Sequence, residues 1–189
     1  MNMMTHQQAL EVLAAHRGER IVITTMGSVG IWPKLSDSPL DFHYMPSAMG
    51  EGSALGLGLA LAQPQRGVIV VNGEGCMLMN LGNLVTIAST SANLFLIIID
   101  NGLYEVTGGQ PTAAAGHADF SGIAKAAGIE RTYSFAELDD WKNRAAEALG
   151  GKGPVVITLK VEGRLGQKTP KPPRTMAEQI ARLAAAIRS

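Results

Sequence analysis

Four short apolar runs constrain the fold of this chain more than any other feature. Segments with helical spacing separate them: RIVITT (20–25), GVIVVN (67–72), LFLIIID (94–100) and PVVITLK (154–160). Runs this apolar indicate strands that are buried on both faces, and strands that alternate with helices indicate parallel pairing. We therefore predict an α/β fold with a doubly wound, mainly parallel sheet and helices on both faces, in a single domain over residues 1–189.

Polar residues mark where the helices between these runs begin. Capping-box patterns, in which Ser or Thr precedes Glu or Gln by three residues, predict helices that open at Thr5, Ser134 and Thr175. Asp119 predicts a cap for another helix, and Asn80 one for a helix over 80–90. Two long stretches, 26–46 and 101–117, show no pattern and are predicted to be irregular.

Charge and cysteine content narrow the classes of function. The 16 basic and 16 acidic residues cancel, so nothing favours nucleic acid or an anionic membrane as a partner. Every apolar run is too short to span a bilayer. A lone cysteine, Cys76, excludes an internal disulfide, and the N-terminus lacks the build of a secretory signal. We expect a cytoplasmic protein that binds a small ligand or a protein partner.

A single acid between two glycines, GEG (73–75), follows the second apolar run. The glycines allow a tight bend, and free N–H groups at such a strand end suit a phosphate. Glu74 would repel a phosphate unless a divalent cation such as Mg²⁺ lay between them. Asn101 follows the next apolar run and could supply an amide oxygen. Either end alone is more often an ordinary turn, but together they predict a metal–diphosphate site.

Longer pieces of sequence resemble one family. The GEG turn and Asn101 are similar to the thiamin diphosphate motif, in which G-D-G is followed, a helix and a strand later, by N-N. Nearly the whole chain further resembles the cofactor-binding half of phosphonopyruvate and sulfopyruvate decarboxylases, through PSAMGEGSALGLGLAL, GEGCMLMNLGNLVTIAS and DNGLYEVTGGQPT. The resemblance implies a lyase that uses thiamin diphosphate and Mg²⁺ to decarboxylate a small 2-oxo acid with an anionic tail.

Roles for individual residues follow from this resemblance. It implies that Mg²⁺ is held by the side chains of Glu74 and Asn101 and by the backbone carbonyl of Leu103. It implies cofactor contacts from Thr25, Ser28, Met49, Gly73, Gly75, Cys76, Asn101 and Leu103, with Thr24 as a further candidate. Met49 stands where the family places a bulky apolar residue under the cofactor. Glu105 is the candidate catalytic acid for proton transfer, and a solvated loop charge is its alternative.

Two positions depart from the family pattern. Glu74 stands where the family usually has Asp, and the extra methylene adds about 1.5 Å of reach, which either shifts the ion or is absorbed by a slack loop. Asp100 replaces the first Asn of N-N, which is not a side-chain ligand in the family. His43 and His117 could exchange protons near neutral pH, although a plain loop histidine is the more ordinary interpretation of each.

One component of the resembled enzymes is not expected within this chain. Those enzymes need an acid, usually Glu, from a pyrimidine-binding domain, and 189 residues accommodate one α/β unit. We therefore expect a hetero-oligomer in which a pyrimidine-binding subunit supplies the activating glutamate. Two alternatives stay open: a non-catalytic scaffold or regulatory subunit, and a thiamin diphosphate enzyme that catalyses carboligation or 2-oxo acid oxidation.

Overall fold

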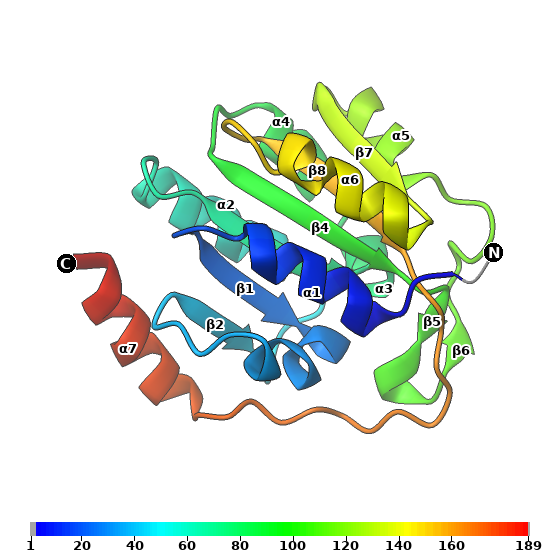
Figure 1. The fold of residues 1–189 in the computed structure, drawn as a ribbon, viewed down its shortest axis with the longest axis horizontal. Coiled ribbons are helices and arrows are strands. Elements are labelled where there is room, and N and C mark those ends of the chain that lie inside the picture. The colour runs from blue at the N-terminus through cyan, green and yellow to red at the C-terminus, as the bar shows by residue number, and fades with distance from the viewer. Residues whose placement is uncertain (1–2, 189) are drawn as a thin grey trace.

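A six-stranded parallel sheet forms the centre of the computed structural model, which describes residues 3–188 (Figure 1). Residues 1, 2 and 189 of the predicted domain lie outside this described part. The strand order is β2-β1-β3-β4-β8-β7, and each neighbouring pair is parallel. The strands are β1 (Ile21–Thr25), β2 (Asp41–Tyr44), β3 (Val68–Gly73), β4 (Leu94–Asp100), β7 (Arg131–Phe135) and β8 (Val155–Lys160). β2 and β3 lie on opposite sides of β1, so the order in which strands are added to the sheet reverses between β1 and β3. In such sheets ligands bind at this topological switch point.

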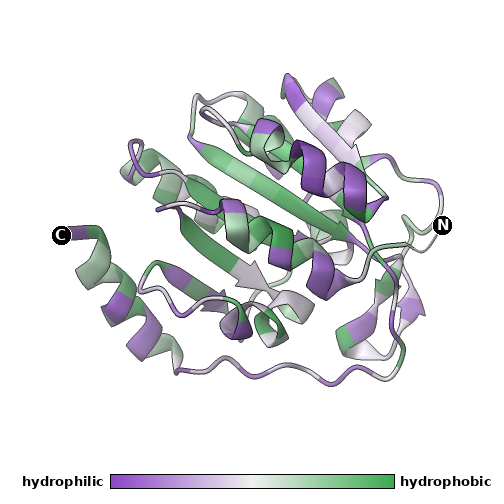
Figure 2. Ribbon diagram, in the orientation of Figure 1, coloured by the Kyte–Doolittle hydropathy of each residue, from purple (hydrophilic) through white to green (hydrophobic). Residues whose placement is uncertain are grey.

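Helices cover both faces of the sheet, as predicted. The helices are α1 (His6–His16), α2 (Gly52–Ala62), α3 (Glu74–Met79), α4 (Asn83–Ala88), α5 (Phe120–Ala126), α6 (Leu138–Ala148) and α7 (Met176–Arg188). Buried side chains form two clusters, one with α1 and α6 and the other with α2, α4, α5 and α7. Figure 2 shows that β4 is hydrophobic along its length, as its burial on both faces requires. Within the described part, no helix is long and apolar enough to cross a membrane.

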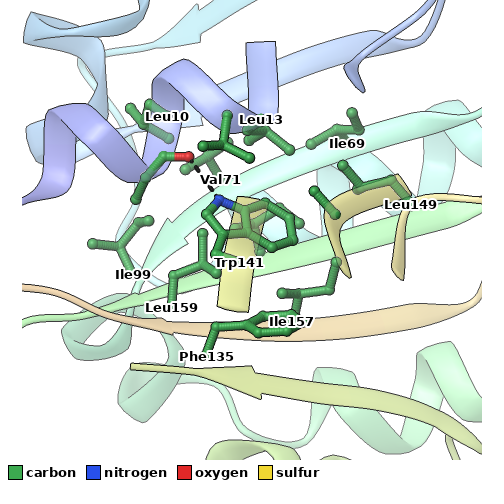
Figure 3. Close-up of a cluster of buried hydrophobic side chains, with 14 of the residues drawn as sticks. Leu10, Leu13, Ile69, Val71, Ile99, Phe135, Trp141, Leu149, Ile157 and Leu159 are labelled. Carbon is green, nitrogen blue, oxygen red and sulfur yellow. Dashed lines mark hydrogen bonds between the residues drawn. The ribbon is translucent and has the colours of Figure 1, made fainter. Parts of the chain in front are cut away.

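Trp141 joins the two helices that cover one face of the sheet (Figure 3). Its side chain is completely buried, and its ring centroid lies 5.0 Å from that of Phe135. The indole Nε1–H donates a hydrogen bond of 3.0 Å to the carbonyl of Ala9 in α1. A buried Trp is therefore used twice here, for apolar packing and for a satisfied N–H donor that ties α6 to α1.

Three of the predicted helix caps are confirmed. Thr5 forms a reciprocal capping box at the start of α1. Thr175 does the same with Glu178 before α7. Asp119 accepts a hydrogen bond from the N–H of Gly122 in α5. In each case a side-chain oxygen satisfies an N–H that the first helical turn leaves free.

Two other predicted caps are wrong. Ser134 lies inside β7, opposite Thr158 of β8, because strand pairing outweighs its local capping pattern. Asn80 ends α3 instead of opening a helix over 80–90, because α3 already begins directly after β3. The helix predicted over 80–90 is consequently shortened to α4, which starts three residues later at Asn83.

Both stretches predicted to be irregular contain short elements. The first holds the edge strand β2 and two 3₁₀ helices, η1 (Met26–Gly30) and η2 (Trp32–Lys34). The sequence did not predict β2 because this strand contains polar residues. Asp41 and His43 are buried in it against distant partners, Arg17 and Thr24. The second stretch holds a small antiparallel hairpin, β5 (Leu103–Tyr104) and β6 (Gln110–Pro111), joined by η3 (Glu105–Thr107).

Candidate functional site

A cavity opens at the carboxyl ends of β1, β3 and β4, beside the point where the strand order reverses. Its walls come from α1, the loop after β1, the segment between β2 and α2, the turn after β3, and the loop after β4. Most residues that the sequence analysis proposed for the metal, the cofactor or proton transfer line this cavity, the exceptions being Thr24, His43 and His117: Thr25, Ser28, Met49, Gly73, Glu74, Gly75, Cys76, Asn101, Leu103 and Glu105. The fold therefore brings five segments of the chain together around this cavity.

The turn after β3 is built differently from the predicted tight bend. Gly73 is extended, with φ −80° and ψ 153°, and α3 begins at the next residue. Among the described residues no side chain caps α3, and an anion is favoured at such a helix end. A Cβ at Gly73 would meet no described atom within 4 Å, so the space above it is open.

Gly75 is a glycine because of a close neighbour. A Cβ added there would lie 2.6 Å from Cε1 of Tyr104, which comes from the loop after β4. Contacts that short are not tolerated, so the ring of Tyr104 can pack on this turn only while residue 75 has no side chain. The two loops that carry the predicted metal ligands thus touch directly.

Glu74 is a buried carboxylate with an unsatisfied oxygen. The residue is 1% exposed, and its Oε1 atom has no hydrogen-bond partner among the described residues. Burial, and next the carboxylate of Asp100, raise the pKa of Glu74 to about 7. The hydroxyl of Thr112 lies near enough to lower this pKa, yet Thr112 Oγ1 is also buried without completing a hydrogen bond. Such groups are costly unless a cation or another polar partner meets them.

Asn101 stands at the end of the neighbouring strand. Gly73 and Ile99 are paired in the β3–β4 register, so Glu74 and Asn101 each follow the last rungs of the same ladder. Asn101 Oδ1 accepts a hydrogen bond of 2.9 Å from the N–H of Leu103, which orients the amide. In the described part no three His, Cys, Asp or Glu side chains gather into a metal cluster. One carboxylate with amide and carbonyl oxygens is the donor set that hard cations such as Mg²⁺ prefer.

The hydroxyls of Thr25 and Ser28 are already engaged within the protein. Thr25 Oγ1 donates to Asn72 Oδ1 at 2.9 Å, and Ser28 Oγ lies 3.0 Å from Nε2 of His6. Both residues line the cavity, but each hydroxyl would have to share or exchange its present partner to contact a ligand. The structure therefore gives these two side chains first of all a role in shaping the loop after β1.

Three other candidates lie away from the cavity. Thr24 Oγ1 is 2.8 Å from Nδ1 of His43, and both residues are buried beside the edge of the sheet. His117 is exposed and contacts the carbonyl of Ala113 through Nε2 at 2.9 Å. The residues that line the cavity do not include any of these three. These contacts support an ordinary structural role for all three residues.

Glu105 is held in place. It lies in η3 with a half-buried side chain, and its Oε1 accepts a hydrogen bond of 2.7 Å from the backbone N–H of Arg164. Its Oε2 lies 3.7 Å from the position that a Cβ on Gly27 would take. Glu105 therefore has one backbone hydrogen-bond partner, in the segment that follows β8.

His6 and Tyr104 line the cavity, although the sequence analysis did not single them out. Burial, and to a smaller extent the charge of Arg164, lower the pKa of His6 to about 4, so the imidazole is neutral at pH 7. The capping pattern placed α1 correctly, but no local signal indicates that the first residue of this helix packs against the loop after β1. Both contacts depend on how distant segments meet.

The sequence matches a known family over residues 25–159, described as "Thiamine pyrophosphate enzyme, C-terminal TPP binding domain". It is 36% identical over 186 residues to phosphonopyruvate decarboxylase of Streptomyces viridochromogenes, covering 97% of this chain and 46% of that protein. The chain thus spans about half the length of this relative. It is also 36% identical to sulfopyruvate decarboxylase subunit beta of Methanothermobacter thermautotrophicus, covering 85% of this chain and 83% of that protein.

Solved structures show the same fold. The thiamine diphosphate-dependent 4-hydroxybenzoylformate decarboxylase of Rhodococcus jostii matches with a TM-score of 0.72 at 20% identity, covering 87% of this chain and 34% of that one. Benzoylformate decarboxylase of Polynucleobacter necessarius matches with a TM-score of 0.67, also at 20% identity, covering 88% of this chain and 34% of that one. These two solved structures therefore have the same doubly wound α/β architecture as this chain.

Proposed function

Because this chain belongs to the family of thiamine pyrophosphate enzyme C-terminal TPP-binding domains, we propose that it is the cofactor-binding subunit of a 2-oxo acid decarboxylase. The names of its relatives support sulfopyruvate or phosphonopyruvate as the substrate. The observation that carries the proposal is the buried, unpartnered oxygen of Glu74 beside Asn101, at adjacent strand ends and in one cavity with the uncapped start of α3. When bound, thiamin diphosphate supplies the electron sink for the loss of carbon dioxide.

The residues of the cavity suit a magnesium–diphosphate group. Glu74, the side chain of Asn101 and the carbonyl of Leu103 would hold Mg²⁺, and the N–H groups of Gly75 and Cys76 would face the diphosphate. A cation there would give Glu74 Oε1 the partner that it lacks. Met49, whose side chain is 37% exposed at the cavity, would offer an apolar support for the organic part of the cofactor.

Glu105 is proposed to carry the proton that the reaction needs. Its carboxylate borders the cavity at Oε2, while the N–H of Arg164 holds Oε1. Proton transfer requires a group that stays within hydrogen-bond reach of the reacting atoms, and an anchored carboxylate satisfies this better than a mobile one.

A second, pyrimidine-binding subunit completes the proposal. The beta-subunit names of several relatives support a hetero-oligomer in which that subunit supplies the activating glutamate. Large apolar side chains are exposed on neighbouring helices, at 55% for Leu61 in α2 and 61% for Val85 in α4, and would suit a protein contact. The free, buried thiol of Cys76 is in keeping with a cytoplasmic location.

Calorimetric titration with thiamin diphosphate and MgCl₂ tests the cofactor proposal. The wild-type chain, alone or with its co-purifying partner, is expected to bind saturably and only when Mg²⁺ is present. Glu74→Gln should weaken Mg²⁺-dependent binding by about 100-fold or more, since it removes the only carboxylate among the three proposed metal ligands. Glu130→Gln, an exposed acid before β7, is the matched control and should bind as wild type does.

An assay with the partner present tests the reaction. Sulfopyruvate or phosphonopyruvate should yield carbon dioxide and an aldehyde, while pyruvate should react more slowly. Saturable cofactor binding without aldehyde from any of the three would favour carboligation or oxidation. The absence of cofactor binding under all conditions would support a scaffold subunit instead.

A further inference from the structure

The five residues after β8 run alongside the loop that carries Asn101, Leu103 and Glu105. We call residues 161–165 the crossing segment. Figure 1 shows the chain leaving β8, passing β5 and β6, and continuing as a long irregular segment to α7. The crossing segment lies outside residues 25–159, the part of the chain that matches the family.

The first two residues of the crossing segment form backbone hydrogen bonds to two other segments, the end of β4 and the residues before α1. The N–H of Val161 donates a hydrogen bond of 2.9 Å to the carbonyl of Asp100, which adds one rung to the ladder between β8 and β4. The N–H of Glu162 donates one of 3.0 Å to the carbonyl of Met4, just before α1. The crossing segment is therefore held in register with the strand end that precedes Asn101.

Gly163 makes the closest approach. A Cβ at this position would lie 2.8 Å from the carbonyl oxygen of Asn101 and 2.6 Å from Cδ1 of Leu103. Gly163 does not have a positive φ, so its backbone conformation does not explain the glycine. What requires it is the lack of room between the crossing segment and the two residues proposed as metal ligands.

Arg164 and Leu165 continue the contact along the same loop. The N–H of Arg164 donates the 2.7 Å hydrogen bond to Glu105 Oε1. Leu165 Cδ2 lies 2.6 Å from the position that a Cβ on Gly109 would take. Successive residues of the crossing segment thus meet successive parts of the loop after β4, whose own strands, β5 and β6, have only two residues each.

We propose that the crossing segment positions the cofactor site: Gly163 sets where Asn101 and Leu103 stand, and the Arg164 amide holds Glu105. This inference rests on the proposed function, because it assigns these residues to a site for Mg²⁺ and thiamin diphosphate. The members of the crossing segment act through the loop after β4, so they are positioning residues. A loop that is half-exposed and short of regular structure has its geometry decided by such outside contacts.

Gly163→Ala tests the metal half of the proposal. The added methyl must displace the Asn101 carbonyl or the Leu103 side chain, so Mg²⁺ affinity, measured by titration at saturating thiamin diphosphate, should fall about tenfold. Leu103→Ala keeps the backbone carbonyl and removes the shorter clash, so the double variant should regain part of the lost affinity. Gly58→Ala, at an exposed helix position with open space, is the control and should bind as wild type does.

Arg164→Pro tests the Glu105 half, because proline removes the N–H while Arg164→Ala keeps it. In the assembled enzyme Arg164→Pro should lower kcat about tenfold or more, with Mg²⁺ and cofactor affinity within about threefold of wild type. Arg164→Ala, which keeps the N–H, should lower kcat much less than Arg164→Pro does. A merely structural role would instead lower the unfolding temperature of both Gly163→Ala and Arg164→Pro without separating affinity from kcat.

The outcomes distinguish this inference from the proposed function. If the wild-type chain binds no cofactor, the proposed function fails first. If wild type binds, and Gly163→Ala folds and binds Mg²⁺ equally well, the positioning role of Gly163 is overturned. Equal kcat values for Arg164→Pro and Arg164→Ala would overturn the role of the Arg164 amide. Should Gly163→Ala fail to fold, the Arg164 pair decides the matter alone.

Discussion

The turn after β3 and the loop after β4 each contribute half of the proposed metal site, yet they are built in opposite ways. The turn is buried and starts at once a helix that packs on β3 and β4: Glu74 is 1% exposed and Cys76 3% exposed. The loop after β4 is half-exposed, forms a hairpin of two-residue strands, and is held by the crossing segment. One half of the site is thus set by local structure and the core, and the other half by contacts with distant segments.

This difference assigns different tasks to the two halves. A buried carboxylate in a fixed turn provides a preformed, costly charge, whereas an amide and a carbonyl on a supported loop can adjust to the ion. Near-octahedral Mg²⁺ coordination needs ligands from several directions, and adjustable oxygens make such a shell easier to complete. If the comparison is right, substitutions in the turn should alter the stability of the free chain much more than those in the loop.

Glu74→Gln should give the largest change, and it should stabilise the chain without ligands. At pH 8 the native state carries an ionised, buried carboxylate whose pKa is raised to about 7 from an ordinary value of 4.5. This difference corresponds to up to about 3 kcal/mol of destabilisation that the amide removes. Urea unfolding without Mg²⁺ would measure the gain.

The pH dependence has a definite sign. A carboxyl group whose pKa is raised in the folded state contributes no penalty below the unfolded pKa of 4.5, and the penalty grows as pH rises through about 7. The gain from Glu74→Gln should therefore disappear near pH 4.5. A variant that is less stable than wild type at pH 8 would contradict the view that the turn carries a costly charge.

Gly75→Ala should come next, with a loss of stability. The new methyl would meet the ring of Tyr104 at 2.6 Å, and overpacking of this kind typically costs about 1–3 kcal/mol. Gly73→Ala is the matched control, since a Cβ there meets no described atom within 4 Å. Thermal unfolding of the two variants compares them directly. Adding Tyr104→Ala should reverse much of the effect of Gly75→Ala, and its failure to do so would mean that another contact requires this glycine.

Asn101→Ala should have a smaller effect on the free chain. It removes the hydrogen bond from the Leu103 N–H to Asn101 Oδ1, whose loss costs about 1 kcal/mol at a half-buried position. The same variant should lose Mg²⁺-dependent binding of thiamin diphosphate. Urea unfolding with and without Mg²⁺ and cofactor separates the two effects. A loss of stability as large as that of Gly75→Ala would show that the loop is as rigid as the turn.

Glu105→Gln should change stability least, by less than about 0.5 kcal/mol, because the amide oxygen can still accept from the Arg164 N–H. Under the proposed function it should nevertheless lower kcat of the assembled enzyme, since an amide cannot carry the proton. Equal kcat values for the variant and wild type would show that Glu105 has only a structural role.

Much of the fold was predictable, because its signals are local. The four apolar runs correspond to β1, β3, β4 and β8, and the caps at Thr5, Asp119 and Thr175 open helices as expected. The errors arose where a distant partner decides. Asp41 and His43 look like loop residues, because nothing local shows that Asp41 pairs with Arg17 after α1 and His43 with Thr24 in β1. Ser134 has a capping pattern but pairs with β8.

The sequence by itself determined which chemical groups stand at the ends of two central strands, because apolar runs and turn residues encode strands and their limits within a few positions. Only the tertiary structure decided that these groups share one cavity with His6, that Tyr104 packs on Gly75, and that Gly163 leaves room for the loop after β4. Close approaches between segments far apart in the chain depend on packing across the whole sheet. The periodicity of apolar residues along the chain does not encode them.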